Sequence, residues 1–329
     1  MIEGLAKAVV EPLAARWRNT ALGTSLVLWL AALLVYVLSR PKAAKCTAGA
    51  RSLPCRIADI ETIGPALLLV AGFGTAVSTA FLAAGVAPGL FTLLTADSWR
   101  AGPAPVAWAG SLLVRFQTHR RTRLSTFAGA AGGSALAAVR RGARFAELRA
   151  RYPMDAAWPV SASACGNALA AVAERLDRKL GLDLSVVWGA LLTVLPEGQY
   201  SRLVAQSSVV LGRCQQLLIA VGGLALAPLF PLRWALAWVL ACLLCALAFR
   251  HGLVRETIAF AAQVHSVVVA HRISLYAAYG LSAPVNPQDE VRCGQTLTRV
   301  LRSFENEAPP TGITYEWPPP PTCGPQPGP

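Results

Sequence analysis

The chain has 329 residues, of which 54% are hydrophobic and 14% are charged, and its formal net charge is +13. A soluble domain carries about 25% charged residues, so this composition excludes an ordinary water-soluble protein and indicates an integral membrane protein. The positive excess is typical of membrane proteins whose Lys- and Arg-rich segments lie in the cytoplasm beside anionic lipid, and the abundance of Ala, Arg, Gly and Pro suggests a bacterial source.

An uncharged stretch over about residues 20–39 predicts the first membrane helix. Basic residues precede it, as in a signal peptide, but its apolar region is longer than the roughly 7–15 residues of a signal peptide and no A-x-A-like cleavage site follows. We therefore expect an uncleaved membrane helix. A basic loop over residues 40–61 follows, in which Cys46 and Cys55 either form a disulfide or remain two free thiols.

The next uncharged stretch predicts a second membrane helix over residues 64–87, which completes an N-terminal segment of residues 1–96. Gly64-Pro65 suits the start of this helix and Pro88-Gly89 suits its end, after which we expect the chain to return along the membrane interface. Small residues on this helix either let another helix approach closely or reflect how common alanine is in the chain. They are Gly72, Gly74, Ala76, Ala80 and Ala84.

Residues 97–208 are predicted to form a basic, cytoplasmic helical region. The expected helices cover 106–124, 134–150, 163–180 and 183–195, and a further helix begins near Gln199. In the third of these, Glu174 faces Arg178 at i,i+4, and Gly181 stands where a helix C-terminus is expected.

A long apolar run, Leu217–Phe249, is interrupted by prolines at 228 and 231. One straight helix over it would reach about 50 Å against a hydrocarbon core of about 30 Å, so we predict a transmembrane hairpin that folds at the prolines. The first arm must start earlier to be long enough, which extends the hairpin to residues 209–249. The longer first arm places a polar cluster at the edge of the membrane, where it serves either as a snorkelling anchor or as a substrate site. Its members are Arg213, Gln215 and Gln216.

Beyond the hairpin we expect the helix to continue to Ala278, and a last short helix completes the C-terminal cytoplasmic helices of residues 250–307. Residues 308–329 form a proline-rich tail that cannot bury a core and is expected to be disordered or polyproline II. Four spans place both termini and the middle region on one side, which holds 24 Lys and Arg residues against 6 on the other. The positive-inside rule assigns the richer side to the cytoplasm.

No motif predicts a catalytic, cofactor-binding or metal site. Gly72 and Gly74 form a Gly-x-Gly inside a membrane helix, without the preceding strand that a nucleotide site requires. Cys242 and Cys245 form a C-x-x-C without a second pair, and we interpret them as apolar filler. The basic runs at 119–123 and 140–144 suit anionic lipid headgroups, and no module typical of nucleic-acid binding is visible. We therefore expect no cofactor and no nucleic-acid partner.

Several short motifs lie between residues 95 and 300. The chain reads RYP at 151–153, CGNALAAVAER at 165–175, GLDLSVVW at 181–188 and HRISLY at 271–276. These motifs resemble a family of uncharacterised bacterial multispan integral membrane proteins. The chain departs from the family pattern at several positions, among them Cys165 in place of Leu and Leu180 in place of Tyr. The resemblance implies a multispan membrane protein with a cytoplasmic helical region, and it implies no known activity or site residues.

The sequence therefore predicts an all-α, four-span integral membrane protein of the plasma (inner) membrane, with a cytoplasmic helical subdomain between spans two and three. Our first functional hypothesis is a membrane-anchored scaffold or interaction protein, with a protein partner or a second copy as its partner besides the anionic bilayer. The alternatives are a transporter or channel subunit and a membrane enzyme acting on lipid. Whether the chain is an enzyme is left open at this point.

Overall fold

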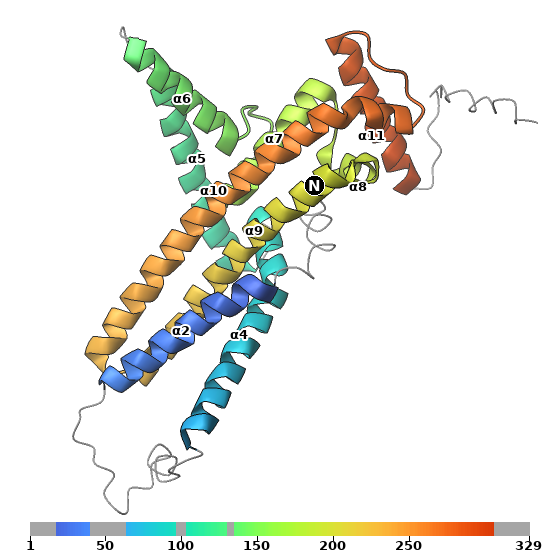
Figure 1. Ribbon diagram of the computed structural model, residues 1–329. Coiled ribbons are helices and arrows are strands. Elements are labelled where there is room, and N and C mark those ends of the chain that lie inside the picture. Colours follow the sequence, from blue (N-terminus) through green and yellow to red (C-terminus); the bar gives the residue numbers. More distant parts are fainter. Residues whose placement is uncertain (1–17, 40–63, 97–102, 130–134, 306–329) are drawn as a thin grey trace, which may run out of the picture. The chain divides into compact units, whose positions relative to one another are not determined.

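The computed structural model describes residues 18–39, 64–96, 103–129 and 135–305, and every regular element within them is a helix (Figure 1). The helices are α2 (Arg18–Ser39), α4 (Gly64–Thr95), α5 (Ala104–Gly129), α6 (Ala135–Arg151), α7 (Ala164–Leu180), α8 (Leu184–Val194), α9 (Glu197–Gly222), the 3-10 helix η3 (Gly223–Leu229), α10 (Leu232–Ala278) and α11 (Pro287–Glu305). The all-α expectation is confirmed for this part of the chain. Cys46, Cys55 and the proline-rich tail lie outside the described residues.

Three helical segments are long and apolar enough to cross a membrane. They are Val70–Thr95 of α4, Glu197–Leu229 of α9 with η3, and Leu232–Ala278, which is α10. The apolar stretch of α2, Ala21–Tyr36, is shorter than these three. The lengths and compositions of these helices are those of a membrane protein.

The expected end of the second membrane helix at Pro88-Gly89 is wrong, because α4 continues through both residues to Thr95. The segment that we expected to return along the membrane interface instead begins with the last turns of this helix. A proline inside a helix removes one N–H donor and crowds the carbonyl four residues earlier, but it does not force the chain to turn. Membrane helices tolerate such a residue because neighbouring groups satisfy the freed carbonyl.

The chain divides into two compact units, which we describe separately. Among the described residues, the apolar unit comprises 18–39, 64–94 and 205–257, and the basic unit comprises 95–204 and 258–305. The helices α9 and α10 each contribute one part to either unit.

Small side chains hold the apolar unit together. Ala80 and Ala83 of α4 pack with Ala21 of α2 and Ile219 of α9 in one buried cluster. The Ser25 hydroxyl of α2 donates a hydrogen bond of 2.7 Å to the Ala76 carbonyl of α4. The helix approach that the small residues of α4 predicted therefore occurs at Ala76 and Ala80, and the approaching helix is α2. Close packing of this kind drives helix association in lipid, where there is no hydrophobic force between helices.

The turn of the hairpin is a 3-10 helix rather than a tight proline turn. Seven residues of η3 follow α9, and Phe230 is extended before α10 begins. The indole N–H of Trp238 donates to the Gly223 carbonyl at 2.8 Å, and the Phe230 ring packs on Trp238 with centroids 5.4 Å apart. A Cβ atom on Gly223 would lie 2.9 Å from the Leu28 side chain, so glycine lets α2 approach this turn.

The expected continuation of the second arm is confirmed, since α10 is one helix of 47 residues. At about 1.5 Å per residue it is about 70 Å long, more than twice the hydrocarbon thickness. It ends before Gly280, whose φ of 66° is the left-handed conformation that glycine adopts at helix C-termini.

The helices of the basic unit begin and end where local signals predict. Ser163 caps α7 by accepting a hydrogen bond from the Gly166 amide, and Gly181 ends it in the left-handed conformation with a φ of 68°. Asp183 caps α8 by accepting from the Ser185 amide. The core between α7, α8, α10 and α11 consists of fully buried large side chains, among them Leu176, Trp188, Leu191, Leu275, Tyr276 and Leu297.

Candidate functional site

Within the described residues, backbone meets backbone at the joint between the C-terminal end of α7 and the helix α11, which we call the α7–α11 joint. Two glycines make it possible. A Cβ atom on Gly294 of α11 would lie 1.8 Å from the Leu180 carbonyl oxygen, and one on Gly181 would lie 2.2 Å from the Val291 carbonyl oxygen. Both distances are far shorter than van der Waals contact, so backbone meets backbone and no side chain fits between them.

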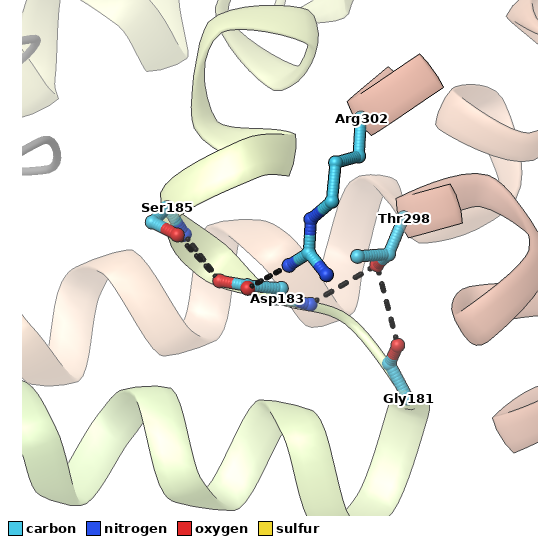
Figure 2. Close-up of polar contacts among 5 residues, drawn as sticks. All are labelled: Gly181, Asp183, Ser185, Thr298 and Arg302. Atoms are coloured by element: carbon cyan, nitrogen blue, oxygen red, sulfur yellow. Dashed lines mark hydrogen bonds and ion pairs between the residues drawn. The ribbon is translucent and has the colours of Figure 1, made fainter. Parts of the chain in front are cut away.

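A polar network continues from this contact along α11 (Figure 2). The Asp183 amide donates to the Thr298 hydroxyl at 3.1 Å, and that hydroxyl donates to the Gly181 carbonyl at 3.4 Å. The Asp183 carboxylate accepts from the amide and the hydroxyl of Ser185, and its other oxygen pairs with Arg302 at 2.8 Å. One carboxylate thus caps α8 and fixes α11, which accounts for the Gly-Leu-Asp order of the motif.

A second carboxyl group lies beside this network. Asp177 and Asp183 line a cavity of about 70 Å³ together with Trp158, Ala173 and Leu184. Partial burial, followed by the charges of Asp183 and Glu174, raises the pKa of the Asp177 carboxyl. Ligand pockets are typically several hundred cubic ångströms, so this cavity accommodates water molecules rather than a substrate.

The RYP motif anchors α5 to the basic unit. The Tyr152 hydroxyl donates to Gln117 Oε1 at 2.8 Å, and both side chains are buried. Burial raises the pKa of the Tyr152 hydroxyl, although the nearby Arg120 and Arg151 lower it. Because a buried amide oxygen is costly without a donor, this bond specifies how α5 meets the segment after α6.

The asparagine of the Gly-Asn motif closes the loop before α7. Asn167 Oδ1 accepts from the Ser161 amide at 2.7 Å, and Asn167 Nδ2 donates to the Ser161 carbonyl at 2.9 Å. In the same helix, Glu174 is buried and pairs with Arg178 at 3.4 Å, which confirms the expected i,i+4 pair.

The last motif joins α10 to α11. The Arg272 guanidinium pairs with Glu290 and also donates to the Val269 carbonyl. Tyr276, the last residue of the HRISLY stretch, is fully buried. Three of the four motifs therefore supply contacts that position one helix of the basic unit against another, and the contacts of Asn167 and Glu174 order α7 and the loop before it; among the described residues none of these contacts leaves a reactive group facing a large cavity.

Sequence reasoning missed the partners of the Gly-Leu-Asp motif, which lie on α11. Gly294, Thr298 and Arg302 are spaced by four residues, so they share one face of that helix. The sequence signal for this contact is Gly294, because a glycine inside a helix lowers helix stability and usually has a packing reason.

The predicted polar cluster on α9 is only partly assembled. Arg213 donates to Gln216 Oε1 at 2.9 Å, whereas Gln215 is fully buried on another side of the helix. A Cβ atom on Gly252 of α10 would lie 3.5 Å from Arg213 Nε, so the guanidinium rests against that glycine. One turn further along α10, Glu256 pairs with Arg255 at 3.0 Å and accepts a hydrogen bond from Gln206 at 3.4 Å.

The remaining candidates for chemistry are dispersed. Among the described residues, no three His, Cys, Asp or Glu side chains gather as metal ligands. Cys242 is buried within the apolar unit and Cys245 is exposed on another face of the same helix. Comparison of the chain with protein-family models, curated proteins and solved structures found no match, so the joint is interpreted from its own contacts.

Proposed function

We propose that the chain is a membrane-anchored scaffold, in which four membrane helices hold the basic unit at the cytoplasmic face of the plasma membrane and both termini lie in the cytoplasm. A protein partner or a second copy of the chain docks on the basic unit. The observation that carries this proposal is the α7–α11 joint, where the polar residues of the motifs are used to fix helices against one another. Such contacts specify a rigid surface, which is what a scaffold presents.

The short apolar helix α2 is the fourth span in this proposal. It supports that role by its packing, because Trp29 donates to the Thr79 hydroxyl of α4 at 3.1 Å in addition to the Ser25 bond. Polar contacts between apolar helices are typical of helix pairs in a bilayer. The helix α10 is continuous and contributes residues to both units.

The packing of α4 favours the scaffold over the transporter or channel. A pore along the small residues of α4 would require them to meet water. Ala76 and Ala80 are buried, with relative exposures of 0% and 5%, whereas Gly72 and Gly74 are exposed. Arg213, which belongs to the polar cluster that the sequence offered as a substrate site, donates a hydrogen bond to Gln216. The motif contacts also support the proposed kinship with bacterial multispan membrane proteins, since each motif has a part in the same helical unit.

Co-purification from native membranes tests the proposal, with two matched glycine variants of the full chain. Gly294→Ala places a methyl group against the Leu180 carbonyl, whereas an added Cβ on Gly142 of α6 meets nothing within 4 Å. The proteins that co-purify with the parent chain are expected to be lost with Gly294→Ala and retained with Gly142→Ala. Reconstituted chain that conducts ions or solutes without any partner would contradict the scaffold and support a transporter.

A further inference from the structure

One face of α5 exposes large apolar side chains that no part of the described chain covers. Trp108 and Phe116 are 66% and 57% exposed, and Leu112 and Leu113 beside them are also exposed. Residues 108, 112 and 116 are spaced by four, so they form one stripe on the helix. The packed side of α5 lies beside this stripe, where Gln117, one residue after Phe116, is buried against Tyr152.

The apolar stripe turns basic along the helix axis. Arg120 and Arg123 are exposed and follow Phe116 on the same side of α5 by about 6 and 10 Å of helix. The headgroup layer of a bilayer is about 5–8 Å thick on each side of the hydrocarbon core, so along the helix axis Arg120 lies within that distance of Phe116 and Arg123 lies just beyond it. A helix with this pattern places its apolar residues at the acyl boundary and its arginines among the lipid phosphates.

We propose that this face of α5, which we call the α5 anchor face (Trp108, Leu112, Leu113, Phe116, Arg120 and Arg123), inserts into the surface of an anionic phospholipid bilayer. The inference rests on the proposed function, since it needs α4 to span the membrane. Only residues 96–103 separate α4 from α5, and a chain of that length reaches at most about 29 Å. The bilayer in which α4 lies is therefore the surface within reach.

Charge favours lipid over a second copy of the chain at this face. The helices α5 and α6 lie side by side in the basic unit (Figure 1) and together carry nine arginines and one glutamate. Two copies that meet through these helices would bring like charges together, whereas an anionic lipid surface neutralises them. Nucleic acid would also neutralise the arginines, but it would leave the apolar stripe exposed to water.

Photo-crosslinking in lipid nanodiscs tests the anchor face with the full chain. A benzophenone amino acid replaces Leu112 or Phe116 in one set of variants, and Thr118 or Thr122 in the control set. The control hydroxyls donate to backbone carbonyls of α5 and lie on a different exposed side of the helix. Mass spectrometry then reports which probes add the mass of a phospholipid.

We expect lipid adducts from positions 112 and 116 and not from 118 and 122. Replacement of Arg120 and Arg123 by Gln should lower the yield in phosphatidylglycerol-containing discs toward that in neutral discs, since one arginine near an anionic surface strengthens binding by about fivefold. Adducts between two copies of the chain, or equal lipid yields from both sets, would overturn the proposal.

A probe at Leu82 separates this inference from the proposed function. Leu82 lies in α4, within a candidate membrane span, and is 70% exposed. Lipid adducts at 82 but not at 112 or 116 would refute the anchor face and leave the membrane anchoring intact. No lipid adduct at Leu82 would contradict the membrane anchoring itself.

Discussion

Replacement of Gly294 by alanine is the sharpest perturbation of the α7–α11 joint. A glycine inside an exposed helix is normally improved by alanine, by up to about 1 kcal/mol. At Gly294 the added Cβ would lie 1.8 Å from the Leu180 carbonyl oxygen, so α11 has to move away by more than about 1 Å to relieve the clash. Helix propensity alone therefore predicts that Gly294→Ala stabilises the protein, whereas the packing at the α7–α11 joint predicts that it destabilises it.

The magnitude follows from what that movement breaks. Overpacking of a tight contact costs about 1–3 kcal/mol, and each hydrogen bond that is lost contributes a further 0.5–1.5 kcal/mol or so. The bonds at risk join Asp183 to Thr298 at 3.1 Å and to Arg302 at 2.8 Å. With the helix-propensity gain of up to about 1 kcal/mol subtracted, we expect the free energy of unfolding of the basic unit to fall by about 1–6 kcal/mol, equivalent to a thermal unfolding midpoint lower by roughly 2–24 °C.

Hydrogen exchange of the purified protein measures this effect locally. Gly294→Ala should accelerate exchange of the amides of α11 and of the α7–α8 corner, whereas Gly142→Ala should leave them unchanged because its Cβ meets open space. Equal protection of α11 in both variants would refute the reasoning that backbone contact at Gly294 fixes this helix.

Three further predictions concern individual polar groups. Asp183→Ala should destabilise the basic unit by about 1–3 kcal/mol, because it removes the cap of α8. Arg302→Ala should cost less than about 1 kcal/mol, since the Arg302 side chain is 53% exposed. Equal losses of stability for the two variants in thermal unfolding would argue against the capping role of Asp183. Tyr152→Phe leaves the buried Gln117 oxygen without its donor and should lower the free energy of unfolding by about 1–3 kcal/mol. Adding Gln117→Leu should restore part of this stability, because it removes the unpaired oxygen. A double variant that is less stable than Tyr152→Phe alone would contradict this explanation. The raised pKa of the Asp177 carboxyl means that its contribution to stability is present below the unfolded-state pKa and is lost as the pH rises through the folded-state pKa. The Asp177→Asn variant should therefore unfold at a higher temperature than the parent protein at about pH 7, and at the same temperature at about pH 3. A difference in unfolding temperature that does not change with pH would exclude charge repulsion as its cause.

Elements defined by short-range signals could be predicted from the sequence. The helix over 163–180 was predicted with its end, because the stop at Gly181 and the pair Glu174–Arg178 depend on residues within one turn. The long helix after the hairpin was likewise predicted, since no proline occurs in it before Gly280.

Features that depend on distant partners could not be predicted in this way. The signal at Pro88 suggested a helix end, but the helix continues because one lost hydrogen bond does not outweigh the cost of exposing backbone groups in an apolar environment. The contact of Gly294 with Leu180 joins residues more than a hundred positions apart, and no local pattern encodes such a pair. The polar cluster on α9 was predicted as a group, yet the 3.6-residue period places Gln215 away from Arg213 and Gln216.

The contacts of the basic unit also explain why motifs with buried polar residues need not indicate catalysis. Asn167, Asp183 and Arg272 each bond to groups on another segment of the same unit. Groups used in this way are held in place by their partners and are poorly placed to exchange protons with a substrate. Their value to the protein is the specific arrangement of helices that they enforce.

The account depends most directly on α2 being the fourth span, with the basic unit on the cytoplasmic side. Labelling of intact cells with a membrane-impermeant maleimide, after mild reduction, measures this in single-cysteine variants. We predict that Cys46 is labelled, whereas Lys7→Cys and Gly142→Cys are labelled only after the membrane is permeabilised. Labelling of Lys7→Cys together with Cys46 in intact cells would show that α2 does not cross the membrane, and labelling of Gly142→Cys would contradict a cytoplasmic basic unit.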